Sequence, residues 1–201
     1  MLSVKHLIDT YSLTADDITQ ILDTAAAFES VNNARVIKKV PALRGRTIVN
    51  LFLEPSTRTK SSFELAEKRL SCDVLNFGGK STSVVKGESL VDTLETLDSY
   101  KIDMVIVRDR HAGVPRLISQ HTPAAVIDAG DGKHQHPTQA LLDLFSIWRA
   151  KGSLDKLHVG IVGDIGHSRV CGSLIPALKI MGAEVTVIAP NTLLPARPDV
   201  L

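Results

Sequence analysis

The sequence predicts an α/β protein in which a parallel sheet is flanked by helices. Short runs rich in β-branched residues alternate along the chain with segments whose apolar residues recur at helical spacing. Consecutive strands that are separated by helices run parallel, and the helices then cover both faces of the sheet. With 201 residues, the chain is long enough for one full domain and part of another.

The first 150 residues form one unit in this prediction. A helix is expected to begin at Thr14, with acidic residues in its first turn, and a basic loop over 31–46 follows it. The expected strands and helices then alternate, which is the pattern of a parallel sheet. The strands cover 48–53, 74–77, 104–107 and 125–127, and the helices cover 61–70, 88–100, 112–120 and 135–150.

A second unit is expected after the Lys151–Gly152–Ser153 boundary. It comprises strands over 158–165 and 184–190 and a helix over 169–181 between them. Two strands with an exposed apolar edge are too little for a free-standing domain, so residues 151–201 are predicted to be an incomplete one. The glycines of this segment lack the third glycine of a dinucleotide-binding fingerprint, and no nucleotide cofactor is expected.

Composition and charge argue against several other classes of protein. Lys+Arg 23 against Asp+Glu 22 gives a net charge of +1, which indicates neither a nucleic-acid partner nor a membrane surface. No run reaches the ~18 apolar residues of a membrane span. Cys72 and Cys171 are far apart, which favours reduced, buried thiols in a cytoplasmic protein. His134 and His136 have no cysteine or carboxylate partner at ligand spacing, so neither a metal nor another cofactor is expected.

The segment after Pro55 is the strongest sign of a ligand site. Pro55 ends an apolar run, and a turn made of Ser56, Thr57, Arg58 and Thr59 precedes the next helical pattern. A helix N-terminus presents unpaired N–H groups and partial positive charge, and hydroxyl groups with a guanidinium suit a phosphate dianion. An ordinary capped helix would also use Ser or Thr here, but capping alone does not require an arginine. We therefore predict an anion site.

Two further segments end at the same edge of the predicted sheet. Arg108 follows the strand at 104–107, and the loop over 128–139 follows the strand at 125–127. Ligands of parallel sheets bind beyond the carboxyl ends of the strands. A single arginine after a strand is usually a surface charge, so Arg108 gains meaning from its position. His136 and Gln139, on the first turn of a helix, can converge on one small ligand.

Three sequence blocks, in order, resemble the aspartate and ornithine carbamoyltransferase family. The first is S-T-R-T followed by S-F-E, the second is STSVVKGESLVDT at 81–93, and the third is DAGDGKHQHPTQALLDLF at 128–145. Glu54–Pro55, the K-G-E-S sequence and H-P-T-Q resemble the aspartate form, whereas ornithine enzymes usually have H-P-C-Q. The resemblance extends from near the N-terminus to about residue 195.

This resemblance implies a binding site for carbamoyl phosphate. His136 would polarise the carbamoyl carbonyl, and Gln139 would hold the carbamoyl amide. Donors aimed at the tetrahedral oxyanion should matter most for the rate. The implied carbamoyl-phosphate ligands are Ser56, Thr57, Arg58, Thr59, Arg108, His136 and Gln139, with Arg110 a weaker alternative to Arg108, and the implied catalytic residues are Arg58, Thr59, Arg108 and His136.

The resemblance also implies an aspartate site shared between subunits. Lys86 would be an ordinary exposed lysine by itself, but the K-G-E-S match implies that it reaches the neighbouring subunit's site and contacts aspartate. The serine of that loop aligns best with Ser83, and Ser81 remains open. Arg169 matches an arginine that binds a substrate carboxylate, although a first-turn residue of a helix can also face solvent.

The implied activity is that of an aspartate carbamoyltransferase, which converts carbamoyl phosphate and L-aspartate to N-carbamoyl-L-aspartate and phosphate in pyrimidine (UMP) biosynthesis. The implied assembly is a cytoplasmic homotrimer, with regulatory or dihydroorotase-like partner chains left open. Residues 151–201 would be the N-terminal part of a Rossmann-like aspartate-binding domain. The family's later R-x-Q-x-E-R motif is absent from the sequence. Two alternatives are therefore a truncated, non-catalytic carbamoyl-phosphate-binding or assembly module and an ornithine-type carbamoyltransferase.

Overall fold

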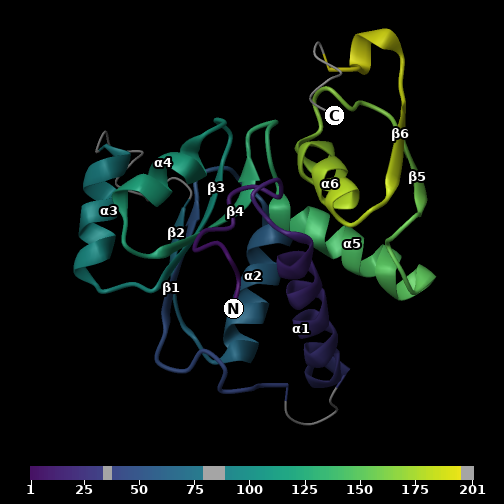
Figure 1. The fold of residues 1–201 in the computed structure, drawn as a ribbon. Coiled ribbons are helices and arrows are strands. Elements are labelled where there is room, and N and C mark those ends of the chain that lie inside the picture. Colours follow the sequence, from purple (N-terminus) through teal and green to yellow (C-terminus); the bar gives the residue numbers. More distant parts are fainter. Residues whose placement is uncertain (34–37, 79–88, 196–201) are drawn as a thin grey trace.

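The computed structural model describes residues 1–33, 38–78 and 89–195. In these ranges the strands form a four-stranded sheet of order β2-β1-β3-β4 and a two-stranded sheet of β5 and β6 (Figure 1). Every pair of neighbouring strands is parallel, which confirms the predicted α/β class. The strands are β1 (Thr47–Phe52), β2 (Asp73–Gly78), β3 (Met104–Asp109), β4 (Ala125–Asp131), β5 (His158–Val162) and β6 (Glu184–Ile188).

Helices separate the strands along the chain, as the alternating pattern predicts. The α-helices are α1 (Ala15–Asn33), α2 (Thr57–Leu70), α3 (Leu90–Ser99), α4 (Val114–His121), α5 (Pro137–Lys151) and α6 (Arg169–Ile180), and a short 3₁₀ helix, η3 (Asn191–Leu193), follows β6. None of the helices in the described ranges is long and apolar enough to cross a membrane.

The four-stranded sheet has a separate apolar core on each face. On one face, α3 and α4 pack against alternate side chains of β1 and β3, with Leu94, Leu97 and Ile118 fully buried. On the other face, Phe63 of α2 packs against Ile48 and its neighbours. Helices α1 and α5 lie on that second side in Figure 1. The ends of β1 and β3 are therefore fixed from both faces, which positions the residues that follow them.

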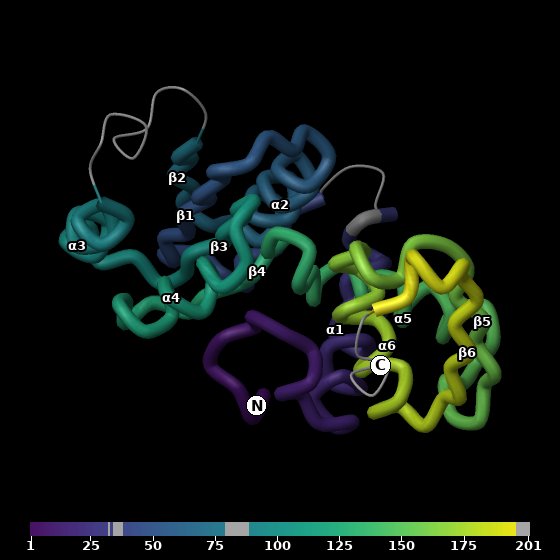
Figure 2. The backbone as a smooth tube through the Cα atoms, turned by 90° about the horizontal axis from the view of Figure 1, so that it is seen from above, coloured from purple at the N-terminus to yellow at the C-terminus, as the bar shows by residue number. Residues whose placement is uncertain are grey.

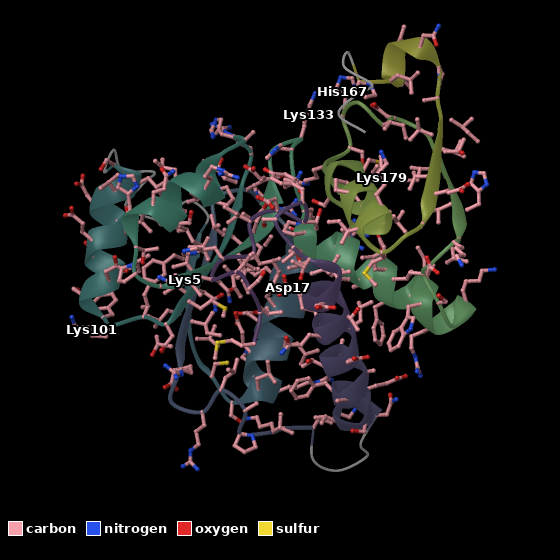
Figure 3. All side chains as sticks on the ribbon, viewed as in Figure 1. Lys5, Asp17, Lys101, Lys133, His167 and Lys179 are labelled. Carbon is pink, nitrogen blue, oxygen red and sulfur yellow. The ribbon has the colours of Figure 1, made fainter. Side chains whose placement is uncertain are left out.

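Helix α5 connects the two sheets. Its buried residues Leu141 and Leu144 share one core cluster with Ile18 of α1 and Leu178 of α6. In Figure 2, β5 and β6 lie on the outer side of α5 and α6, away from the four-stranded sheet. The start of α1 is anchored by Asp17, labelled in Figure 3, whose carboxylate accepts hydrogen bonds from both N–H and hydroxyl groups of Ser3 and Thr14.

Helix α2 differs from its prediction in two ways. It begins at Thr57, because Ser56 is already its N-cap residue, so the predicted turn forms the first turn of the helix. The apolar residues at helical spacing in the predicted 61–70 segment are not core residues: Phe63 and Leu70 are half-buried, and Ala66 is exposed. The residue of α2 that is buried is Glu67, because Asn50 of β1 provides a polar partner within the core.

The two-stranded sheet has one packed and one exposed face. Val187 and the other inward side chains contact α6, whereas Val162 is 75 % exposed and Ile188 is 55 % exposed. These two exposed residues are register partners on adjacent strands. They form a small apolar pair that is open to contact with other molecules.

We expect replacement of this apolar pair to reduce self-association of the 201-residue chain. The double substitution Val162→Thr and Ile188→Thr keeps β-branched residues while it removes exposed apolar surface. Sedimentation velocity should show less aggregated material, and the free energy of unfolding should change by only about 0.5 kcal/mol. Val187→Thr is the control: it places a hydroxyl in the α6 core and should cost about 1–3 kcal/mol. Unchanged aggregation in the double variant would contradict this role.

Candidate active site

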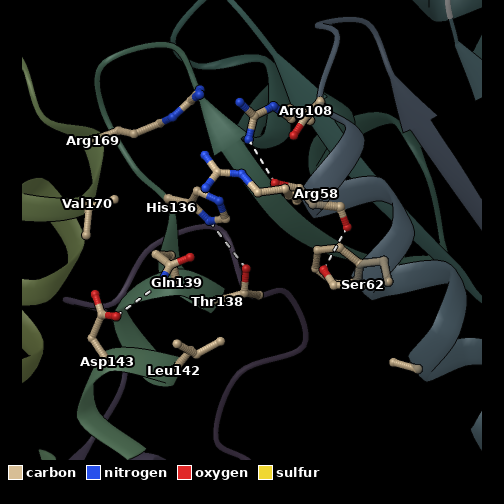
Figure 4. Close-up of a pocket in the computed structure, with 14 residues that line it drawn as sticks. Arg58, Ser62, Arg108, His136, Thr138, Gln139, Leu142, Asp143, Arg169 and Val170 are labelled. Atoms are coloured by element: carbon tan, nitrogen blue, oxygen red, sulfur yellow. Dashed lines mark hydrogen bonds between the residues drawn. The ribbon is translucent and has the colours of Figure 1, made fainter. Parts of the chain in front are cut away.

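A cavity of about 680 Å³ lies at the carboxyl ends of the strands of the large sheet (Figure 4). The N-termini of three helices, α2, α5 and α6, contribute to its wall, because Ser56, His136 and Arg169 stand at or next to their first turns. Three helix N-termini give the cavity partial positive charge. The lining residues are Ser56, Arg58, Thr59, Ser62, Phe63, Ala66, Arg108, His136, Thr138, Gln139, Leu142, Asp143, Arg169 and Val170.

The first turn of α2 has unused hydrogen-bond donors. The N–H of Lys60 bonds to the carbonyl of Ser56, so the N–H groups of residues 57–59 have no intrahelical acceptor. The Ser56 hydroxyl does not cap the helix. Arg58 is exposed to the cavity and, within the described residues, has no carboxylate in ion-pair distance. This turn therefore keeps its hydroxyl, N–H and guanidinium groups available for an anion, which a simple helix cap would not.

Two further arginines are held by one carboxylate. Arg108 leaves β3 and is only 8 % exposed, and Arg169 begins α6. Glu54, in the loop before α2, accepts from Nη1 of Arg169 at 3.1 Å through Oε2 and from Nη2 of Arg108 at 3.4 Å through Oε1. Nε of Arg108 lies 3.3 Å from Glu54 Oε2 but is not aligned for a hydrogen bond. Glu54 thus connects the four-stranded sheet with the second unit.

The charges of this cluster affect one another. Burial raises the pKa of Glu54, but hydrogen bonds from Arg169 and the charge of Arg108 outweigh it, so its pKa lies below the ordinary value. Burial, and then the neighbouring charge of Arg169, lower the pKa of Arg108. Arg108 also donates to Thr59 Oγ1 at 3.3 Å and to the carbonyl of Ala129 at 3.1 Å. Its guanidinium is therefore fixed beside the first turn of α2.

His136 is neutral at physiological pH. It is the N-cap residue of α5, and burial, together with the charges of Arg108 and Arg169, lowers its pKa to about 4. The Thr138 hydroxyl lies 3.3 Å from Nδ1. In the tautomer in which Thr138 donates to Nδ1, the proton is on Nε2, and the ring has a neutral N–H to offer to a ligand. Figure 4 shows His136 between the side chains of Arg58 and Gln139.

Other polar groups support this wall of the cavity. Gln139 donates to Oδ1 of Asp143, one turn later in α5, at 3.0 Å. The N–H of His136 donates to Ser173 Oγ at 2.8 Å, which ties the start of α5 to α6. These bonds fix the positions of His136 and Gln139 on the helix.

Asp128 is a buried acid behind the arginines that motif analysis did not single out. Its side chain is fully buried, Oδ1 accepts from the N–H of Gly130 and Oδ2 has no partner within the described residues. Burial raises its pKa to about 8. Asp128 is then mostly protonated at neutral pH, so it does not cancel the positive charge of the cavity. The sequence predicted a loop from residue 128 onward, whereas β4 continues to Asp131, so the burial of Asp128 could not be predicted.

The structure brings most, but not all, of the predicted site residues together. Thr57 is exposed and is not part of the cavity lining, and Arg110 is exposed outside it, which favours Arg108 of the two arginines. Lys86, Ser81 and Ser83 lie outside the described residues. Glu54 belongs to the matched Glu54–Pro55 sequence, but its contacts with Arg108 and Arg169 were not predicted. Within the described ranges, no three His, Cys, Asp or Glu side chains are grouped as metal ligands.

The fold and the cavity define an α/β protein with a cavity rich in positive charge at the carboxyl end of a parallel sheet, a place that suits a small anion. Residues 5–149 match the family model described as aspartate/ornithine carbamoyltransferase, carbamoyl-P binding domain. The chain therefore belongs to the aspartate/ornithine carbamoyltransferase family.

Named relatives resemble the chain over nearly its whole length. An aspartate carbamoyltransferase catalytic subunit from Christiangramia forsetii is 55% identical over 200 residues, which are 100% of this chain and 64% of that protein. The catalytic subunit of M. jannaschii aspartate transcarbamoylase superposes with a TM-score of 0.87 at 37% identity, and covers 98% of this chain and 64% of its own. Aspartate transcarbamoylase from Trypanosoma cruzi in complex with carbamoyl phosphate gives 0.91 at 33% identity, with coverages of 100% and 61%. The chain thus spans less than two thirds of the length of these relatives.

We expect His136 to make stability depend on pH. Between pH 6.5 and about 4 the unfolded state binds a proton at this residue and the native state does not, so stability falls as the pH falls. The His136→Asn variant keeps a good N-cap residue but cannot titrate. Urea unfolding at pH 7.5 and pH 5 should show that the wild type loses about 2 kcal/mol more than the variant. Parallel losses in the two proteins would contradict a neutral, buried His136.

Proposed function

We propose that this chain binds carbamoyl phosphate in the cavity and supplies the carbamoyl-phosphate half of an aspartate carbamoyltransferase. The complete reaction would join the amine of L-aspartate to the carbamoyl carbon, break the carbon–oxygen bond to phosphate and release one proton from the amine. Its products are N-carbamoyl-L-aspartate and phosphate, as in pyrimidine biosynthesis. The observation that supports this most is the convergence of Arg58, Arg108 and a neutral His136 on one cavity with three helix N-termini.

The proposal divides the chain into two parts. Residues 1–150 would be the carbamoyl-phosphate-binding domain, a division supported by the family model over 5–149 and by Gly152, which ends α5 in the left-handed conformation. Residues 151–201 would be the N-terminal part of the aspartate-binding domain. In support, β5, α6 and β6 form a separate two-stranded sheet with its own small core.

Each proposed ligand has a matching chemical group in the cavity. The phosphate would bind at Ser56, Thr57, Arg58 and Thr59, where N–H and hydroxyl groups are available and Arg58 adds charge. Thr57 would contribute through its backbone N–H, since its side chain does not line the cavity.

The carbamoyl group would lie between α5 and the end of β3. Thr59, Arg108 and His136 would donate to the carbonyl oxygen, on which negative charge develops in the transition state. His136 can do this only as a neutral imidazole with its proton on Nε2, which its lowered pKa favours. Gln139 would bind the carbamoyl amide.

Aspartate would bind on the side of the second unit. Arg169 would contact one of its carboxylates, after exchange of part of the contact with Glu54. Lys86 is proposed to contact aspartate across the interface of a trimer. We also propose a cytoplasmic location, for which the two free cysteines, Cys72 and Cys171, are the supporting observation.

Removal of Arg58 should abolish tight phosphate binding with little loss of stability. The side chain is exposed to the cavity, so Arg58→Ala should weaken inorganic phosphate or carbamoyl phosphate binding by about 2–5 kcal/mol, roughly 30-fold to 4,000-fold, in calorimetric titrations. Lys60→Ala removes the same charge from the same helix outside the cavity lining and should retain affinity. Equal affinity in wild type and Arg58→Ala would refute the proposed phosphate site.

A turnover assay separates the enzyme from a non-catalytic binding module. The relatives are longer than this chain, and the second carboxylate of aspartate needs a further cation in a water-poor site. We therefore expect the purified 201-residue polypeptide to bind carbamoyl phosphate but to show negligible carbamoylation of aspartate. Sedimentation equilibrium should give a trimer of the 21.7 kDa chain. Rapid turnover would contradict the expectation that catalysis requires the additional length of the relatives. A strictly monomeric chain would contradict an active site shared between subunits.

A further inference from the structure

A buried polar pair joins α2 to β1 behind the cavity. Asn50, in the centre of β1, is 0% exposed, and Glu67 of α2 is 3% exposed. Nδ2 of Asn50 donates to Oε2 of Glu67 at 2.9 Å. Ile48 and Phe52, which share a face of β1 with Asn50, belong to the apolar cluster on this side of the sheet. Neither Asn50 nor Glu67 lines the cavity.

Each member of the pair also has an oxygen without a partner. Within the described residues, Oδ1 of Asn50 and Oε1 of Glu67 are buried and accept no hydrogen bond. Both atoms are acceptors if Glu67 is ionised, so they cannot satisfy each other. A carboxylate in this apolar layer would also be poorly solvated. One proton on Glu67 would supply the donor that both oxygens lack.

We propose that Glu67 is a protonated carboxylic acid in the native protein and forms a reciprocal pair with Asn50. Oε1–H of Glu67 donates to Oδ1 of Asn50, while Nδ2 of Asn50 donates to Oε2 of Glu67. The pair is uncharged and closed, so it fits an apolar layer without an unsatisfied oxygen.

The surrounding groups are consistent with a proton at this position. Burial, and then the charge of Glu64 on the same helix, raise the pKa of Glu67, while the bond from Asn50 and the charge of Lys68 lower it, and the net direction is upward. Burial also raises the pKa of the Cys72 thiol beside Glu67, so this neighbour adds no charge at neutral pH. The buried members of the apolar cluster on this side of the sheet are Ile48, Phe52, Ile106 and Ala129. One polar strand residue also faces α2: Asn76 of β2, the register partner of Asn50, donates to Glu64 and not to Glu67.

The position of the pair gives it a function in the anion site. One face of α2 provides Arg58, Thr59, Ser62, Phe63 and Ala66 to the cavity wall. Glu67 follows Ala66 and fixes this helix to the strand that leads to Glu54. Glu67 is therefore a positioning residue: it contacts no ligand, but it sets where the first turn of α2 stands relative to Arg108.

The charge state can be measured directly. In protein with ¹³C-labelled glutamate, the Cδ resonance that is missing from Glu67→Gln belongs to Glu67. We expect it to keep the shift of a protonated acid at pH values above the ordinary glutamate pKa of about 4.3, because burial raises the pKa of Glu67. Titration of this resonance at an ordinary value would overturn the proposal, because an ionised Glu67 cannot donate to Asn50.

Unfolding measurements provide a second test. The native state keeps a proton that the unfolded state loses above about pH 4.3, so stability falls with rising pH up to the native pKa of Glu67. The folding equilibrium of wild type relative to Glu67→Gln should fall about tenfold per pH unit in that window. Gln keeps both hydrogen bonds but cannot titrate. Glu64→Gln, the same change on the same helix, should retain the wild-type slope. If the wild type and Glu67→Gln showed the same dependence of stability on pH in this window, the proposal would be overturned.

The positioning role is tested with inorganic phosphate as the probe. Glu67→Gln should bind phosphate as the wild type does, whereas Glu67→Met, which fills the space but leaves Asn50 unpaired, should bind it severalfold more weakly. Native affinity in a folded Glu67→Met protein would overturn the positioning role. If Glu67→Met does not fold, the phosphate affinity of the double variant Asn50→Leu and Glu67→Met is compared with that of the wild type. This double variant leaves no buried polar group without a partner at this position. The phosphate-binding test rests on the proposed function. If the wild type did not bind phosphate, the proposed function would be refuted, whereas the resonance of Glu67 would still show whether this residue is protonated.

Discussion

The contact of Glu54 with two arginines is the interaction on which the geometry of the cavity depends. Arg108 comes from β3 and Arg169 from α6, so their guanidinium groups belong to different parts of the molecule. Burial, and then repulsion between these two cations, lower the pKa of Arg108. A carboxylate between them compensates this repulsion and at the same time sets their distance. Without it, the second unit would lose its main polar connection to the loop before α2.

The remaining positive potential is left for a ligand. The carboxylates of Glu54 and Asp143 stand against the three guanidinium groups of Arg58, Arg108 and Arg169, and the N-termini of α2, α5 and α6 add partial positive charge. Burial, and then the charges of Arg108 and Arg169, keep His136 neutral, since a further cation would be unfavourable there. The raised pKa of Asp128 keeps a neighbouring acid mostly neutral, so the site retains its preference for anions. The fold, the helix dipoles and the directions of these pKa shifts therefore all favour an anionic ligand.

Sequence patterns could predict the parts of this arrangement that depend on chain order. Alternating strands and helices placed Ser56, Arg108 and His136 beyond the carboxyl ends of parallel strands, and the structure brings them to one cavity. The first residue of α2 was harder to predict, because a serine that caps a helix and a serine that binds an anion occur at the same position in a sequence. The burial of Glu67 could not be predicted, since helical periodicity places apolar residues inside and gives no sign of Asn50 across the core. Contacts between distant segments, such as Glu54 with Arg169, have no local signal at all.

In the proposed function, the first turn of α2 forms one anion site together with Arg58 and Arg108. A crystal structure of the chain grown with inorganic phosphate tests it most directly. We expect phosphate at the N-terminus of α2, in contact with the N–H groups of residues 57–59 and with both guanidinium groups. Phosphate bound elsewhere while this turn stays empty at saturating concentration would contradict it.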